Sequence, residues 1–122
     1  MPHSDISATY RLVVTAMEER RLVLCRYQGR PRVLCPVVLG WSEDREKLLG
    51  YQLGGQSSRP LTTPETRWRC LFLDEVSDAV LGEAWPEIDT PHQASQTCVR
   101  EVDYDINPKS PFHPRHKLGW QR

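Results

Sequence analysis

Arginine is the residue type whose spacing in this sequence most clearly suggests binding chemistry. Five arginines lie in or beside apolar, strand-like runs: Arg26, Arg30, Arg32, Arg67 and Arg69. The planar guanidinium group donates paired hydrogen bonds to phosphate or carboxylate. The rings of Tyr27, Tyr51 and Trp68 lie close by in the sequence and offer surfaces on which a nucleobase can stack. We therefore predict a site for a nucleotide or single-stranded nucleic acid at Arg30, Arg32, Tyr51, Arg67 and Arg69.

The alternative is that these arginines form a solvated sheet face and pair with acidic side chains. The candidate acidic partners are Glu46, Glu65, Asp74 and Glu75. The formal net charge is zero, so no overall field attracts a polyanion, and any such site must be a local patch.

Nucleophilic catalysis finds no support in the sequence. No G-x-S-x-G motif is present, and no histidine falls within the strand-like runs that would support a serine or cysteine nucleophile. Asp74 and Glu75 are neighbours at the end of a predicted strand, so their side chains should point to opposite faces. We expect a protein that is not an enzyme and has no cofactor.

The cysteines and histidines are candidates for a disulfide or a metal site. Cys25, Cys35, Cys70 and Cys98 form no C-x-x-C pair, and we predict reduced, buried thiols. His113 and His116 could share a metal ion, with Cys98 or Asp105 assisting, but we predict no metal site, because a proline separates the two histidines.

An amphipathic helix is predicted at the N-terminal end. Ile6, Tyr10, Val13 and Met17 fall on one helical face, and Ser4 or Asp5 can cap the helix. Five short strands follow, at about 22–27, 32–41, 46–53, 67–73 and 76–81. Because proline cannot donate a ladder hydrogen bond, the second strand should bulge or bend at Pro36 or lie at an edge of the sheet.

The composition changes at Pro86. The segment 86–122 is rich in proline and poor in aliphatic residues, which is typical of an extended arm. Tyr104, Phe112 and Trp120 are the residues through which it could dock. We therefore expect a domain over 1–85 and an extended C-terminal arm over 86–122.

The order of elements predicts an α+β fold in which the N-terminal helix packs on a strongly bent antiparallel sheet, an SH3-like or Sm-like small barrel. Five runs resemble the WYL domain: Ala16–Tyr27, Pro31–Val33, Pro36–Gly40, Leu48–Tyr51 and Trp68–Val76. The run Gly50–Ser57 is similar to short stand-alone bacterial proteins of unknown function related to that domain. In place of the tripeptide that names the family, this chain has Lys47-Leu48-Leu49. Glu75 stands where many members carry arginine.

The resemblance implies a ligand-sensing or accessory module that works with a separate regulator protein. The alternative function is a structural protein–protein interaction or oligomerisation module, and a homo-oligomer is compatible with both. The sequence has no signal-peptide pattern and no apolar run of membrane-spanning length, which predicts a cytoplasmic location without a membrane partner.

Overall fold

The computed structural model describes residues 6–55, 67–86, 98–106 and 114–116, and it has one helix and a six-stranded antiparallel sheet. The elements are α1 (Ala8–Glu19), β1 (Arg21–Tyr27), β2 (Arg30–Ser42), β3 (Arg45–Gly55), β4 (Trp68–Phe72), the 3-10 helix η2 (Leu73–Glu75), β5 (Val76–Ala84) and β6 (Glu101–Asp105). The predicted α+β class is confirmed. Within the described ranges, no helix is long and apolar enough to cross a membrane.

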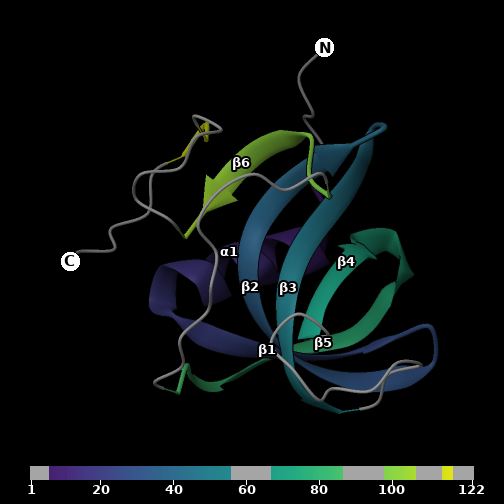
Figure 1. Ribbon diagram of the computed structural model, residues 1–122, viewed down its shortest axis with the longest axis vertical. Coiled ribbons are helices and arrows are strands. Elements are labelled where there is room, and N and C mark those ends of the chain that lie inside the picture. The colour runs from purple at the N-terminus through teal and green to yellow at the C-terminus, as the bar shows by residue number, and fades with distance from the viewer. Residues whose placement is uncertain (1–5, 56–66, 87–97, 107–113, 117–122) are drawn as a thin grey trace.

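The sheet is curved and has the strand order β4-β3-β2-β1-β5, with β6 added beside β2 (Figure 1). The long strand β2 pairs with β1 along its first half and with β6 along its second half. The register with β3 shifts between Pro36 and Val38, so the bulge predicted at Pro36 is confirmed. Among the described residues β4 and β5 do not pair with each other, so the sheet is not closed into the barrel that the sequence predicts.

Helix α1 begins one turn later than predicted. Its N-cap is Ser7, whose hydroxyl accepts a hydrogen bond from the Tyr10 amide at 3.0 Å, so the cap predicted at Ser4 or Asp5 is wrong. The buried face carries Tyr10, Val13 and Met17, as the spacing predicts, but Ile6, which the same spacing assigned to this face, lies before the helix. The helix ends at Arg20, whose backbone is left-handed.

Strand β6 approaches β2 closely at Gly40. A Cβ atom at this position would overlap the backbone carbonyl oxygen of Glu101 and crowd the side chain of Val99. Glycine is therefore required here, because it alone lacks a Cβ atom. Residues 101–105 belong to the segment predicted as an arm, and in the structure they form a strand of the same sheet.

A disulfide bond joins Cys70 in β4 to Cys98, just before β6. The prediction of reduced thiols is wrong for this pair and confirmed for Cys25 and Cys35, which are buried and free. The two bonded cysteines are 28 residues apart, and their Cα atoms lie 5.8 Å apart. Only the sheet topology brings the two cysteines together, so no local sequence pattern predicts the bond.

Replacing both Cys70 and Cys98 with serine should lower the free energy of unfolding by about 3 to 4 kcal/mol, because closing a loop of this length removes entropy from the unfolded chain. Urea unfolding followed by tryptophan fluorescence measures the change. A phosphine reductant should shift the wild-type midpoint and leave the double variant unaffected. Equal midpoints for wild type and variant would contradict the prediction.

Candidate functional site: the arginine cluster

The five predicted site residues lie on different faces of the sheet. Arg32 pairs with Cys25, and Arg69 pairs with Gly50, which places both arginines on the inner face, the face that carries Val23, Leu34 and Leu48. Tyr51 pairs with Trp68 on the outer face, where the two rings meet edge-on with centroids 5.1 Å apart. The structure therefore separates Tyr51 from the arginines with which the sequence grouped it.

Arg32 is a buried cation with few partners. Its residue is only 5% exposed, and its guanidinium donates one hydrogen bond, at 3.1 Å, to Oε1 of Gln52. The Nε atom has no hydrogen-bond partner. The guanidinium lies 5.5 Å from the centroid of the Tyr27 ring. Burial lowers the pKa of Arg32, and the neighbouring positive charge of Arg30 lowers it further.

The other arginines surround this position in different environments. Arg67, just before β4, donates to the backbone oxygens of Gln52 and Leu53 at 3.2 and 3.0 Å. Arg69 is buried and donates to the backbone oxygen of Trp68. Arg30 is half-buried at the start of β2, and the exposed Arg26 donates to the Gly29 carbonyl. The positive charge of Arg30 thus acts on Arg32, whose pKa it lowers.

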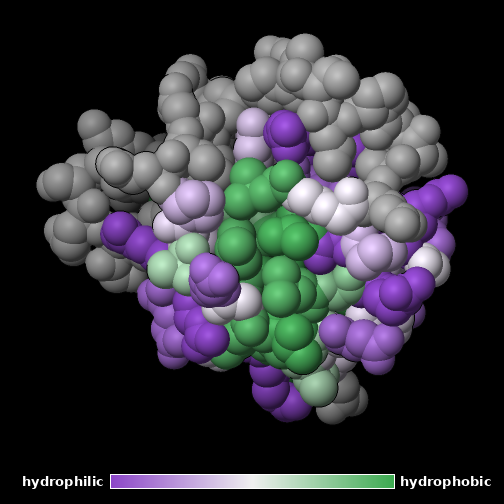
Figure 2. Space-filling model, turned by 90° about the horizontal axis from the view of Figure 1, so that it is seen from below, coloured by the Kyte–Doolittle hydropathy of each residue, from purple (hydrophilic) through white to green (hydrophobic). Residues whose placement is uncertain are grey.

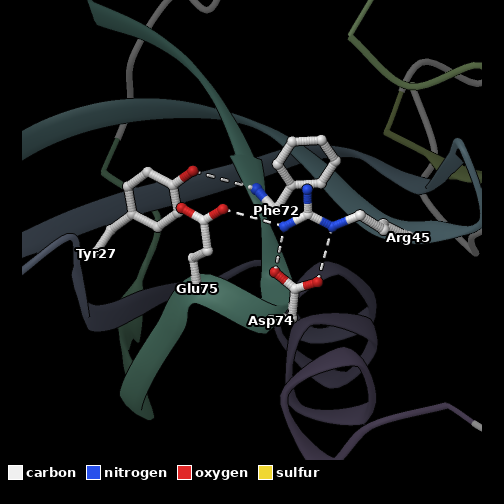
Figure 3. A network of polar contacts seen from close by, with 5 residues as sticks. All are labelled: Tyr27, Arg45, Phe72, Asp74 and Glu75. Atoms are coloured by element: carbon white, nitrogen blue, oxygen red, sulfur yellow. Dashed lines mark hydrogen bonds and ion pairs between the residues drawn. The ribbon is translucent and has the colours of Figure 1, made fainter.

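The acidic residues proposed as alternative partners bind elsewhere. The Arg45 guanidinium donates a bidentate pair of hydrogen bonds to the Asp74 carboxylate, at 2.8 and 2.6 Å, and a further hydrogen bond to Glu75 at 3.0 Å (Figure 3). This contact lowers the pKa of the Asp74 carboxyl. Glu46 accepts hydrogen bonds from the amide and hydroxyl of Ser7, and Glu65 lies outside the described residues.

Asp74 and Glu75 share one partner because they lie in η2, not in a strand. The expectation that they point to opposite faces is therefore wrong, since a 3-10 turn does not alternate side chains as a strand does. The guanidinium of Arg45 and the ammonium of Lys47 both lie over the Phe72 ring, at 3.4 and 3.5 Å from its centroid. These contacts of Arg45 and Lys47 hold the β4–β5 connection against the start of β3.

The two free cysteines are poor nucleophiles. Burial raises the pKa of Cys25 to about 11 and that of Cys35 to about 12, so both thiols are protonated at neutral pH. In the part of the chain that the structure describes, no group of His, Cys, Asp or Glu side chains is arranged to hold a metal ion. His116 stacks on Tyr104, Cys98 is in the disulfide, and His113 lies outside that part.

Sequence reasoning missed Gln52, which links the cluster together. Its side chain accepts from Arg32 and donates to the Gly54 carbonyl, while its backbone accepts from Arg67. The sequence carries no clear signal, because Gln52 alternates with Glu46, Leu48 and Gly50, whereas Leu49, Tyr51 and Leu53 form the more apolar face of the predicted third strand. A buried polar side chain needs a partner, and Arg32 supplies one.

Comparisons with known proteins add no relationship to this geometry: no family model matches the chain, and no curated protein or solved structure is significantly similar to it.

Iodoacetamide should leave the native, oxidised protein unmodified, because its free thiols are buried and carry raised pKa values. Intact mass should show two adducts after unfolding without reductant, on Cys25 and Cys35, and four adducts after unfolding with reductant. The unfolded samples are the control for reagent activity. An adduct on Cys25 or Cys35 in the native state would show that these side chains are accessible.

Proposed function

We propose that the protein is a ligand-binding accessory module that takes a phosphate-bearing ligand, a nucleotide or single-stranded nucleic acid, at Arg30 and Arg32. The observation that carries this proposal is the Arg32 guanidinium, which is buried, has an unpaired Nε, and forms no ion pair with a carboxylate of the described residues.

A buried cation without a counter-charge is costly, and an anionic ligand relieves that cost. A phosphate also offers several acceptor oxygens to a guanidinium, which donates through a rigid fork. Arg30 adds a second positive charge close by, as its effect on the pKa of Arg32 shows. Tyr27 supplies the ring beneath the Arg32 guanidinium.

The remaining predicted site residues take supporting roles in this proposal. Arg67 and Arg69 contribute positive charge while their hydrogen bonds to backbone oxygens hold them in place. Tyr51 is buried against Trp68 and supports that ring. Trp68 is half-buried beside Tyr51 on the outer face, so it is not the stacking ring of this site, and Tyr27 is the ring that lies at the Arg32 guanidinium.

The proposal also includes the barrel-like fold and the family resemblance that the sequence suggests. The bent sheet with one N-terminal helix is compatible with an open form of an SH3-like or Sm-like barrel, and the WYL-like resemblance belongs to the same proposal. The module would recognise a ligand without chemical conversion and pass the signal to a separate regulator in the cytoplasm. The Cys70–Cys98 disulfide is unusual for that compartment, where disulfides are rare.

Self-association is a second candidate function, and an exposed apolar surface favours it. Leu24 and Val80 are 36% and 52% exposed, pair directly across β1 and β5, and have Val33 of β2 in the same row. Figure 2 shows hydrophobic residues gathered in one patch on the face of the molecule seen from below Figure 1. Such patches mark interaction surfaces. Two register shifts interrupt the pairing of β5 with β1, which disfavours strand addition at this edge and favours face-to-face contact with a second copy.

Binding of labelled single strands and mononucleotides, measured by fluorescence polarisation, tests the first candidate. Arg30→Ala should weaken oligonucleotide binding and reduce the slope of log K against log salt by about 0.7, the value for one lost phosphate contact on a single strand. Arg32→Ala should abolish binding. Its fold must be checked by thermal unfolding, because Arg32 is buried. Arg11→Ala, an exposed arginine on α1, is the matched control. Absence of binding to the wild type at low salt would refute the proposal.

Light scattering tests the second candidate. The wild type should associate as its concentration rises, and replacing Leu24 and Val80 with serine should keep the chain monomeric, because the apolar row is removed. Thr15→Ser on α1 is the matched control. A wild type that stays monomeric at every concentration would rule out this function.

A further inference from the structure

A cavity beside Trp41, at the other end of β2 from Arg32, has the chemistry of a second binding site. It has a volume of about 240 Å³, which is below the roughly 300 Å³ of the smallest drug-sized pockets. The side chains that matter for the argument are Tyr10, Trp41, Asp103, Tyr104, Arg115 and His116. They come from α1, β2, β6 and the segment 114–116.

Asp103 is held rigidly in this cavity. Its residue is only 6% exposed, and its Oδ2 atom accepts hydrogen bonds from the Tyr10 hydroxyl and from Nε1 of Trp41, the latter at 3.0 Å. Its Oδ1 atom is buried and accepts no hydrogen bond. The carboxylate is thus oriented by its neighbours and retains one acceptor atom that can serve a ligand.

Arg115 balances this charge incompletely. Its Nε lies 3.5 Å from Oδ1 of Asp103, which is longer than a hydrogen bond, while its terminal nitrogen contacts Glu101 at 3.2 Å. The Arg115 side chain is about half exposed, at 52%. The backbone of this segment is held against β6 by hydrogen bonds from the amides of Arg115 and His116 to the carbonyl oxygens of Val102 and Asp103. An outside cation can therefore compete for Oδ1.

Aromatic rings surround this acceptor. Tyr10 lies 6.0 Å from Trp41 and 6.5 Å from Tyr104 between ring centroids, and His116 stacks on Tyr104 at 4.8 Å. The faces of such rings attract cations. Burial and the Asp103 carboxylate raise the pKa of Tyr10, with a smaller contribution from Glu46. Burial raises the pKa of Tyr104, with smaller contributions from Glu18 and Asp103, so acidic side chains add to the negative field here.

We infer that this cavity binds a small, planar organic cation with N–H donors, of the amidinium or guanidinium class, with Asp103 Oδ1 as acceptor and the aromatic rings as walls. The guanidinium of Arg115 is an internal competitor for the same carboxylate. The site is independent of the arginine cluster, which has the opposite charge preference.

Titration with benzamidinium, followed through the Trp41 indole N–H resonance, tests the inference. Benzamidinium should produce a saturable shift, whereas neutral benzamide and anionic benzoate should bind about tenfold more weakly or worse, because neither supplies a charged donor to the carboxylate. Benzamide binding as tightly as benzamidinium, or no saturation with benzamidinium, would overturn it.

Two variants sharpen this test. Asp103→Asn should weaken benzamidinium binding about tenfold or more. Asp78→Asn is its matched control, because Asp78 is exposed on β5 in a left-handed backbone that asparagine accepts. Arg115→Ala should tighten binding, since the competitor is removed, and thermal unfolding checks that the fold is retained without the Arg115 contacts to Asp103 and Glu101. Unchanged or weaker binding by Arg115→Ala would overturn the inference even if Asp103→Asn failed to fold.

Discussion

The buried carboxylate of Asp103 is the contact on which the arrangement of helix and sheet depends. A buried carboxylate must be satisfied by donors, or its desolvation cost destabilises the fold. Tyr10 of α1 and Trp41 of β2 provide those donors, so three distant parts of the chain must meet at one point. Burial and the adjacent carboxylate raise the pKa of Tyr10, which keeps its hydroxyl protonated as a donor. The position of α1 against the sheet follows from this contact.

Two sets of contacts hold β6 and the segment before it against the rest of the sheet. On one side, Asp103 reaches the helix, and on the other, the segment before β6 passes over Gly40 and is joined to β4 through Cys98. These contacts are polar, steric and covalent, and they act together with the burial of Val99, Val102 and Ile106 in the core. They also explain why a segment with few aliphatic residues forms a regular strand.

Much of the fold could be predicted from the sequence because its signals are local. The spacing of Tyr10, Val13 and Met17 located the helix, and Pro36 located the bulge. In β4 Arg69 alternates with the buried Leu71, but the sequence alone did not show that this face is the inner one. Contacts between distant residues, such as Tyr10 with Asp103 and Cys70 with Cys98, have no local signal. The candidate site was therefore found in part, as Arg30 and Arg32 without Gln52.

The disulfide gives the chain a closed covalent ring that runs from Cys70 to Cys98. A peptide bond cut anywhere inside this ring opens it without separating the molecule, because the sulfur–sulfur bond still connects the two pieces. One piece retains α1 and the first three strands, and the other retains β6. Such a nicked protein would remain a single molecule in an oxidising solution and would separate into two chains only after reduction and unfolding.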